Sequence, residues 1–250
     1  MVLGSPSIIL SVRGLTKNYG LGEAQIAVLR GVDLDVGEGE MCAVIRPSGV
    51  GKSTLLNLVA GLDEPDDGTI EVLGTPLVGL DDEARTLVRR DKIGIVYQFF
   101  NLVSNLTAIE NVLLPYYIAE VPPDLQAARH ALERVGMSKR ADHLPAQLSG
   151  GEMQLVSIAR ALVRKPALVL ADEPTGNVNV ATGRRILGML REVLKETGSS
   201  MLMVTHNPED AARADRVVFM KDGLVPQEAS IQGQVVDVAE IHQRLRELGI

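Results

Sequence analysis

The sequence predicts an α/β fold with a largely parallel sheet, and three observations support that prediction. Four short apolar segments are typical of buried parallel strands: 41–45, 93–98, 167–171 and 201–206. Segments of helical periodicity separate these strands, as the crossovers of a parallel sheet require. A longer helical stretch at about 99–158 interrupts the alternation, which indicates a helical lobe inserted into the domain.

The first part of the chain is predicted to be mostly β. Two β-like pieces, SIILSV and AVLRGVDLDV, lie within 7–36 on either side of a glycine-rich turn at 20–22. A helix at 52–60 follows the strand 41–45 and stops at Gly61. TIEVLG at 69–74 is predicted to be another strand, because it follows a turn signal, DDG.

The second part is predicted to be mostly helical. Residues 107–143 have helical character, with a break at Pro115 and a loop around Pro122 and Pro123. Residues 180–196 form an amphipathic pattern whose apolar face consists of Ile186, Leu187, Leu190, Val193 and Leu194. Residues 216–225 are expected to form a closing hairpin, and the last 20 residues a helix at about 235–249.

Composition excludes several classes of protein. The chain has 250 residues with 46% hydrophobic and 23% charged residues, which is typical of a globular protein. The net charge of −7 argues against a nucleic-acid partner. The single cysteine, Cys42, excludes an internal disulfide and fits a reducing compartment. No apolar run approaches the roughly 20 residues of a membrane span, so a cytosolic protein is expected, free to dock onto a membrane protein.

A loop between the strand 41–45 and the next helix has the pattern of a phosphate-binding loop. Its residues are Arg46, Pro47, Ser48, Gly49, Val50, Gly51, Lys52, Ser53 and Thr54. Backbone N–H groups and a helix N-terminus there favour negative charge, Lys52 would reach the β- and γ-phosphates, and the Ser53 hydroxyl would bind Mg²⁺. The first glycine of the usual pattern is replaced by Arg46, a change expected to weaken nucleotide affinity without abolishing it. Taken alone, GKST could also be an ordinary helix start.

Two further segments point to phosphate chemistry. LVLADE (168–173) is a buried strand that ends in Asp172, suited to hold Mg²⁺, and Glu173, suited to polarise an attacking water. LSGGEMQ (148–154) places Ser149, Gly150 and Gly151 before a helix, which makes a second anion site. Each could also be a common structural turn. Two anion sites in one chain suggest that a phosphate group is bound from both sides, with the second site supplied by another copy of the protein.

In combination these segments resemble the ATP-binding cassette (ABC) ATPases of membrane transporters. The resemblance covers about 8–225, and seven motifs occur in that family's order: Tyr19, RPSGVGKST, Gln98, LSGGE, LVLADE, GNVN (176–179) and His206. The segments 98–112 and 171–177 further resemble the branch that serves macrolide export, lipoprotein release and cell division. The resemblance implies a RecA-like P-loop NTPase core, an N-terminal antiparallel β subdomain, an inserted helical subdomain and a C-terminal tail at 226–250.

The resemblance also implies a role for each motif residue. Tyr19 would stack on adenine, and residues 46–54 would cradle the phosphates. Gln98 would bind Mg²⁺ or the attacking water. Glu173 would be the general base, Asp172 would support Mg²⁺, and His206 would contact the γ-phosphate. Ser149, Gly150, Gly151 and Glu152 would form the signature that contacts ATP held by the second protomer of a homodimer.

The chain departs from the family pattern at several positions besides Arg46. Asn179 stands where the family has aspartate, Met153 where it has glutamine, and Leu155 where it has a basic residue. Asn179 is still expected to cap the following helix. Arg46, Leu155 and Asn179 leave open a degenerate regulatory cassette that binds ATP with little hydrolysis. Real hydrolysis is favoured, because Lys52, Gln98, Glu173 and His206 are all present.

The partner expected from the resemblance is a membrane-spanning permease that docks near Gln98 and the helical lobe, at the cytoplasmic face of the membrane. Five of the seven aromatic residues fall in this region: Tyr97, Phe99, Phe100, Tyr116 and Tyr117. They would line a helix-binding groove or fill the core of the lobe. A soluble cassette of DNA repair or translation is disfavoured, because the stretch before the signature has no sustained heptads.

Overall fold

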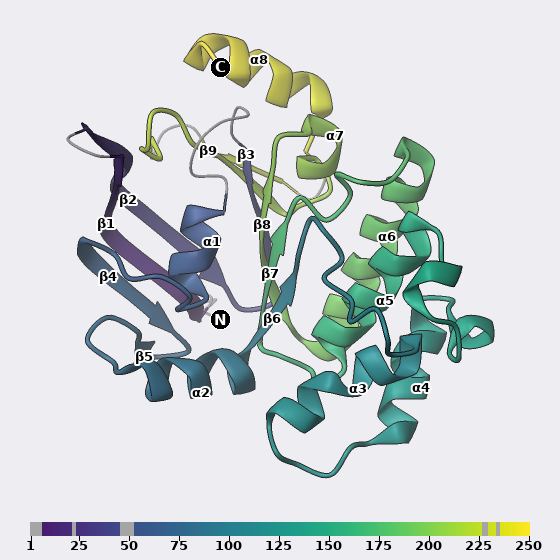
Figure 1. The fold of residues 1–250 in the computed structure, drawn as a ribbon. Coiled ribbons are helices and arrows are strands. Elements are labelled where there is room, and N and C mark those ends of the chain that lie inside the picture. The colour runs from purple at the N-terminus through teal and green to yellow at the C-terminus, as the bar shows by residue number, and fades with distance from the viewer. Residues whose placement is uncertain (1–6, 22–23, 46–52, 227–229, 234–235) are drawn as a thin grey trace, which may run out of the picture.

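The computed structural model describes residues 7–21, 24–45, 53–226, 230–233 and 236–250. It contains two sheets with helices packed on and between them (Figure 1). The strands are β1 Ile8–Leu21, β2 Ala24–Gly37, β3 Met41–Ile45, β4 Asp67–Val72, β5 Thr75–Pro76, β6 Ile93–Val96, β7 Leu168–Asp172, β8 Ser200–Thr205, β9 Arg216–Phe219 and β10 Ile231–Gln232. The helices are α1 Thr54–Val59, α2 Asp82–Lys92, α3 Ala108–Ile118, α4 Leu125–Arg134, α5 Gly150–Leu162, α6 Val180–Thr197, α7 Pro208–Ala211 and α8 Val238–Leu248.

The larger sheet confirms the predicted parallel core. Its strand order is β10-β9-β3-β8-β7-β6, and all its pairs are parallel except β10 with β9. Its central strands are buried on both faces, because side chains alternate between two apolar clusters. In β3, for example, Met41, Ala43 and Ile45 enter one cluster, while Cys42 and Val44 enter the other. This explains the continuous apolar runs in the sequence.

The smaller sheet is antiparallel, as expected for the N-terminal region. Its order is β2-β1-β4-β5. The helix α1 packs between the two sheets, and its Leu55, Leu58 and Val59 join the cluster formed by their facing residues. On the other face of the larger sheet lie α3 to α6, whose apolar residues form the second cluster (Figure 1). The predicted apolar face of 180–196 is buried as expected, in α6. The predicted boundary at 225–226 between domain and tail stays a prediction.

The expected break at Pro115 is wrong, because α3 runs through this residue. Proline removes one helix hydrogen bond. The helix is nevertheless held at both ends: Thr107 and Glu110 form a capping box, and the N–H of Ala119 donates to the carbonyl of Pro115 at 3.2 Å. Burial of Ile109, Val112 and Leu113 adds packing energy that proline does not remove. The loop at 122–123 is present between α3 and α4.

The expected hairpin at 216–225 is also wrong in its pairing. The partner of β9 is β10, and within 216–225 only a tight turn closes, between Lys221 and Leu224. The carbonyl of Gly223 in this turn accepts a hydrogen bond from the N–H of Arg30 in β2, at 2.8 Å. The turn therefore contacts the antiparallel sheet and does not extend β9 into a hairpin.

The helix α2 was not predicted, although its signals are in the sequence. Asp81 caps it by accepting a hydrogen bond from the N–H of Ala84 at 2.8 Å. Acidic residues occupy its first turn and basic residues its last, the distribution that favours a helix dipole. The final helix was predicted correctly, as α8, and it ends at Gly249 with a positive φ of 64°. Among the described residues, no helix combines the length and the apolar character that crossing a membrane requires.

Candidate functional site

The predicted site residues follow the carboxyl ends of neighbouring parallel strands. In the order β3-β8-β7-β6, the last residues pair across the sheet: Ile45 with Thr205, Asp172 with Val204, and Val96 with Ala171. Polar residues after these strands therefore meet at one edge of the sheet, the usual position of a ligand site in an open α/β sheet. The four residues brought together in this way are Ser53, Gln98, Glu173 and His206.

Ser53 and Asp172 form the first pair at this edge. The Ser53 hydroxyl donates a hydrogen bond to Oδ2 of Asp172 at 2.6 Å. Residues 46–52, which include the predicted Lys52 and Arg46, lie outside the described residues. A hydroxyl beside a carboxylate is a hard oxygen donor set that suits Mg²⁺. Among the described residues, no group of three or more carboxylate, histidine or cysteine side chains could hold a metal by itself.

Glu173 and His206 form the second pair. Nδ1 of His206 lies 2.9 Å from Oε1 of Glu173. The Glu173 side chain is only 3% exposed, whereas that of His206 is 46% exposed. Glu173 has a positive φ of 42°, a backbone conformation that is unusual for a residue with a side chain and often marks functional sites. Its N–H still donates to the carbonyl of Val204 at 2.9 Å, so the adjacent strand holds this residue in place.

The side-chain amide of Gln98 and the carboxylate of Glu173 both lie close to Gly176. A Cβ atom added to Gly176 would lie 3.2 Å from Nε2 of Gln98 and 3.3 Å from Oε2 of Glu173. The small residue thus lets an amide and a carboxylate approach the same point. The backbone carbonyl of Gln98 accepts a hydrogen bond from the Asn177 side chain at 2.7 Å. Asn177 therefore joins the segment after β6 to the segment after β7.

The helix α5 carries two polar residues whose roles the motif analysis missed. Gln154 is buried, and its amide donates to the carbonyls of Pro174 at 2.8 Å and Tyr97 at 3.4 Å. Arg160 donates to the carbonyls of Phe100 and Asn101 at 2.9 and 2.6 Å. A buried polar residue within an apolar helix pattern was the available signal. The two residues link α5 to the segments that follow β6 and β7.

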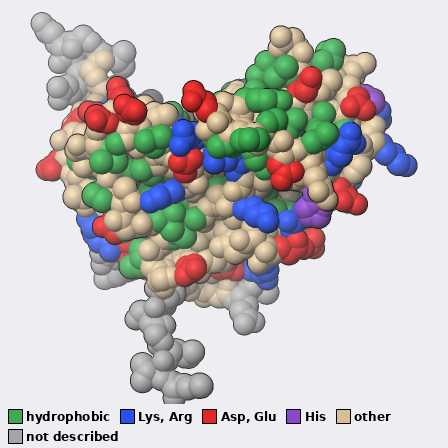
Figure 2. Space-filling view, turned by 90° about the horizontal axis from the view of Figure 1, so that it is seen from below, with side chains coloured by type: hydrophobic (Ala, Val, Ile, Leu, Met, Phe, Trp, Pro, Cys, Tyr) green, Lys and Arg blue, Asp and Glu red, His purple; other side chains and the backbone are tan. Residues whose placement is uncertain are grey.

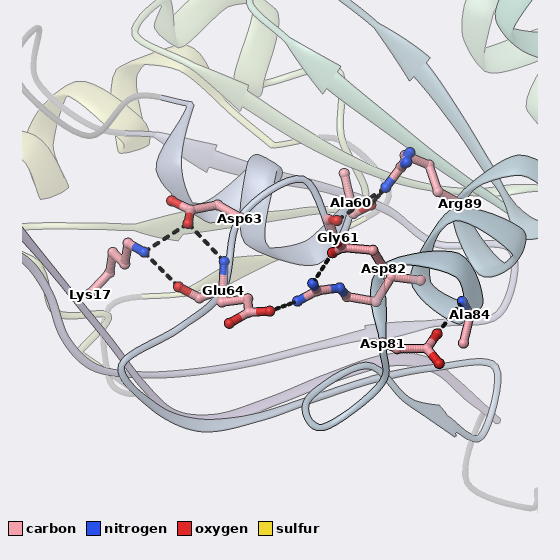
Figure 3. A network of polar contacts seen from close by, with 10 residues as sticks. Lys17, Ala60, Gly61, Asp63, Glu64, Asp81, Asp82, Ala84 and Arg89 are labelled. Carbon is pink, nitrogen blue, oxygen red and sulfur yellow. Dashed lines mark hydrogen bonds and ion pairs between the residues drawn. The ribbon is translucent and has the colours of Figure 1, made fainter.

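Tyr19, on β1, lies beside the start of α1, where its side chain forms a hydrogen bond with that of Thr54. Its hydroxyl donates to Oδ2 of Asp63 at 2.7 Å, and the Lys17 ammonium lies 5.1 Å from its ring centroid. Burial and then the Asp63 hydrogen bond raise the pKa of Tyr19. Lys17 also binds Asp63 at 2.8 Å and the Glu64 carbonyl at 2.6 Å (Figure 3). Burial alone would raise the pKa of Asp63, but these hydrogen bonds lower it overall. Asp63 was not identified from the sequence.

The predicted signature residues form a helix start with a surface hollow beside it. Ser149 caps α5, and Glu152 completes a capping box by accepting hydrogen bonds from the Ser149 N–H and hydroxyl, both at 2.8 Å. These bonds, backbone first, lower the pKa of Glu152. The hollow has a volume of about 550 Å³ and is lined by Gly150, Gly151, Asn177 and Asn179, among others.

Three described residues that depart from the family pattern, Asn179, Leu155 and Met153, have structural roles. Asn179 caps α6 by accepting a hydrogen bond from the N–H of Thr182 at 2.9 Å, as predicted. Leu155 is 1% exposed and belongs to the apolar cluster of α3 to α6, and Met153 packs against that cluster. Apolar packing thus replaces the polar residues that the family pattern has at 153 and 155.

Comparison with known proteins identifies the family. The family model described as ABC transporter matches residues 29–176. The lipoprotein-releasing system ATP-binding protein LolD of Gluconobacter oxydans is 48% identical over 87% of this chain and 95% of the relative. The chain belongs to the ABC transporter family. It is an ATP-binding subunit, and the degenerate cassette considered above has no support from these comparisons.

Further relatives of this ABC subunit agree in function and fold. The LolD protein of Cereibacter sphaeroides is also 48% identical, over 88% of this chain and 99% of the relative. The dimeric ATP-binding cassette MJ0796, solved in a post-hydrolysis state with ADP and Pi, superposes with a TM-score of 0.82. It is 38% identical and covers 89% of this chain and 98% of its own. The predicted P-loop NTPase fold is therefore confirmed, and the family hydrolyses ATP.

Proposed function

We propose that this ABC subunit hydrolyses ATP at the edge formed by β3, β8, β7 and β6, as half of a homodimer that powers a lipoprotein-releasing type of transporter. The observation that carries the proposal is the pairing of Glu173 with His206 beside Ser53 and Asp172. The relatives named for lipoprotein release support the transporter type. As an ABC transporter subunit related to these proteins, it would act from the cytoplasmic face of the membrane, bound to a permease.

Nucleotide binding would use both sheets. Residues 46–54 would hold the phosphates, with Lys52 at the β- and γ-phosphates. Tyr19 would stack on adenine, and its hydrogen bond to Asp63 supports this role by fixing the direction of the ring. Ser53, Asp172 and Gln98 supply the oxygen atoms that would hold Mg²⁺. Bound there, the ion would neutralise phosphate charge.

Hydrolysis would proceed by direct attack of water on the γ-phosphate. Glu173 would accept the proton of that water, and its position at the end of β7, paired with His206, supports this role. His206, whose side chain is half exposed, would contact the γ-phosphate with Nε2, while Nδ1 faces Glu173. Gln98 would orient the water, since it approaches Glu173 at Gly176. Positioning and charge, without a covalent intermediate, would supply the acceleration.

The second protomer would complete each site. Ser149, Gly150, Gly151 and Glu152 would contact the ATP bound by the partner, and the hollow beside them offers room for that contact. The dimeric state of the solved cassettes supports this arrangement. Asn177 contacts the backbone of Gln98 and borders the hollow, so it would communicate between the two halves.

The permease would dock in a groove between α2, β6, α3 and α5, which we call the docking groove. It has a volume of about 460 Å³ and is lined by Tyr97, Leu114, Pro115, Ile118 and Pro166, among others. Of the predicted aromatic residues only Tyr97 lines it. Phe99 and Tyr117 are 68% and 54% exposed, and Tyr116 packs against the helical core. This distribution supports a groove with one aromatic residue and an aliphatic floor.

Purified protein would test the proposal by ATP turnover, with Glu173→Gln and Arg46→Gly measured alongside. We expect turnover in the wild type and a loss of about 10²- to 10⁴-fold in Glu173→Gln, the range for loss of a general base. ATP-dependent dimerisation should persist in that variant. Binding and dimerisation without wild-type turnover, even with a permease present, would refute a motor function. Activity only in Arg46→Gly would place a defect in the phosphate loop.

A further inference from the structure

The start of α5 carries a carboxylate at the place where the proposed function puts a phosphate. Glu152 is the third residue of α5. The N-terminal end of a helix attracts anions, whether these are side chains or ligands. Under the proposed function this end contacts the triphosphate of ATP held by the partner, and a carboxylate at the same end repels that group. The negative charge of Glu152 therefore has to be compensated for the contact to form.

Glu152 also uses the hydrogen-bond donors of Ser149. Its Oε2 accepts hydrogen bonds from the N–H and the hydroxyl of Ser149, both at 2.8 Å. A serine hydroxyl has a single proton to donate. While this proton is directed at Glu152, it is not available to a phosphate oxygen. Contact between the Ser149 hydroxyl and the ATP of the partner thus requires that the hydroxyl turn away from Glu152.

Arg140 provides the compensating charge. Its Nε lies 3.3 Å from Oε1 of Glu152, the carboxylate oxygen that the Ser149 hydroxyl does not use. Among the described residues, no other basic side chain forms an ion pair with Glu152. The hydrogen bonds from Ser149, backbone first, and then the charge of Arg140 lower the pKa of Glu152, so its side chain is ionised at neutral pH. The carboxylate consequently keeps a charged partner when the Ser149 hydroxyl leaves it.

The backbone around Arg140 is tied to the helical lobe. Arg140 ends a short 3₁₀ helix, Ser138–Arg140, and its carbonyl accepts a hydrogen bond from the N–H of His143 at 3.0 Å. The carbonyl of His143 accepts one from the N–H of Ala108, the first residue of α3, at 2.9 Å. Nη1 of Arg140 also lies 3.0 Å from Nε2 of His143, which accepts because a guanidinium only donates. These contacts hold the guanidinium beside the start of α5.

The pair of Arg140 and Glu152 is accessible to a second copy of the chain, since the two side chains are 49% and 29% exposed. Each copy carries a net charge of −7, so two copies repel each other as they associate. On the face of the helical lobe that Figure 2 shows, at the right, acidic and basic side chains are interspersed without a large area of one sign. Charge on that face is thus balanced by local pairs. An unpaired carboxylate at the contact between two copies would add to their repulsion.

We propose that Arg140 is a positioning residue for the signature, residues 149–152: it neutralises Glu152 and keeps this carboxylate when the Ser149 hydroxyl turns to the ATP of the partner. The inference rests on the proposed function. Glu152 then retains the Ser149 N–H and Arg140 as donors, and the hydroxyl donates to a phosphate oxygen. One hydrogen bond is exchanged for another, and no charge is left unpaired. The exchange occurs twice in a homodimer, once at each site.

A double-mutant cycle on the full-length protein tests whether Arg140 acts through Glu152. The proteins are Arg140→Gln, Glu152→Gln, the double variant and Arg140→Lys, each combined with Glu173→Gln so that ATP is not consumed. Sedimentation velocity at saturating Mg²⁺ and ATP gives the Kd of the dimer, and titration of a fluorescent ATP analogue gives the nucleotide Kd of the monomer. Arg244→Gln is the matched control, because it removes a partly exposed arginine that also pairs with a glutamate, Glu247 in α8.

We expect Arg140→Gln to raise the Kd of the ATP-bound dimer about tenfold when Glu152 is present, and less than about threefold in the Glu152→Gln background. Arg140→Lys, which keeps the charge, should have a smaller effect than Arg140→Gln, and Arg244→Gln should have none. The effect of Arg140→Gln should decrease as salt rises. Nucleotide binding by the monomer and thermal unfolding should change little in Arg140→Gln, which a merely structural role would not explain.

Two outcomes would overturn the inference. An equal loss with and without the Glu152 carboxylate would mean that Arg140 contacts the nucleotide or the partner directly. No loss in either background would mean that the charge of Glu152 needs no compensation. If Arg140→Gln does not fold, Arg140→Ala replaces it in both backgrounds.

The same samples distinguish the inference from the proposed function. An ATP-dependent dimer that is insensitive to Arg140→Gln rejects the inference alone and leaves the proposed function standing. Absence of ATP-dependent dimerisation in every protein, the Glu173→Gln parent included, contradicts the homodimer of the proposed function and the inference with it.

Discussion

Oε1 of Glu173 lies 2.9 Å from Nδ1 of His206, at the ends of the adjacent strands β7 and β8. The sequence separates these residues by 33 positions, and the parallel pairing of their strands brings them together. The carboxylate is buried and the imidazole is half exposed. One side of the pair is thus held by the protein, and the other is open to a ligand.

His206→Ala should therefore impair chemistry and not folding. The variant loses the contact with Glu173 and, under the proposed function, a contact with the γ-phosphate. We expect ATP turnover to fall about 10²-fold or more while nucleotide Kd changes little. Steady-state turnover and equilibrium binding measure the two effects. The exposed His242→Ala on α8 is the control. A His206→Ala protein with full turnover would contradict the role of the pair.

Gln154→Leu should destabilise the protein, because the buried carbonyl of Pro174 loses a hydrogen-bond donor. The Gln154 amide donates to the carbonyl of Pro174 at 2.8 Å, and leucine leaves that buried oxygen without its donor. We expect a loss of about 1–3 kcal/mol in the free energy of unfolding. Chemical denaturation gives the value. Met153→Leu, at the preceding residue of α5, conserves volume and should cost less than about 1.5 kcal/mol. Equal losses in both variants would argue against the hydrogen bond.

Substitution of alanine for two glycines should change the stability of the protein in opposite directions. A Cβ at Gly94 in β6 would lie 2.5 Å from the carbonyl oxygen of Ala161 in α5, so Gly94→Ala forces strand and helix apart. We expect a loss of about 1–3 kcal/mol. A Cβ at Gly188 in α6 would meet no atom within 4 Å, and Gly188→Ala should stabilise by up to about 1 kcal/mol. Thermal unfolding of both variants tests the pair, and a stable Gly94→Ala protein would contradict the close packing.

Asp210 should make stability depend on pH. Thr175 donates a hydrogen bond to this carboxyl, and burial raises the pKa of Asp210 above its ordinary value. At a pH between the ordinary pKa of the unfolded chain and the raised pKa of the folded protein, folded Asp210 keeps a proton that the unfolded chain releases. Stability therefore falls as pH rises through that window, from about pH 4 upward. Asp210→Asn keeps an acceptor for Thr175 and does not titrate.

We accordingly expect Asp210→Asn to gain stability relative to wild type as pH rises from about 4 to 7. Denaturant unfolding across that range measures the difference. Asp142→Asn, at an exposed position, should show no such trend. A constant difference between Asp210→Asn and wild type at every pH would mean that burial does not affect this carboxyl as described.

The sequence by itself determined the parallel core and the identity of the motif residues. Buried parallel strands have apolar runs without alternation, and polar residues at their ends stand out, as Asp172, Glu173 and His206 do. Local capping rules identified the starts of α5 at Ser149 and α6 at Asn179. These features depend on short stretches of chain, so a pattern within the sequence is sufficient to find them.

Only the tertiary structure decided which distant groups meet. Packing against the helical core carries α3 through Pro115, although proline is a local signal for a break. The turn at Gly223 binds β2 instead of forming the hairpin that its residues indicate. Asp63, Gln154 and Arg160 form hydrogen bonds with residues of other elements that are far away in the sequence. No helical or strand periodicity predicts such pairs. Local propensity is worth tenths of a kcal/mol to about 1 kcal/mol per residue, and burial of an apolar side chain about 1.5–3 kcal/mol. Where the two conflict, packing therefore prevails.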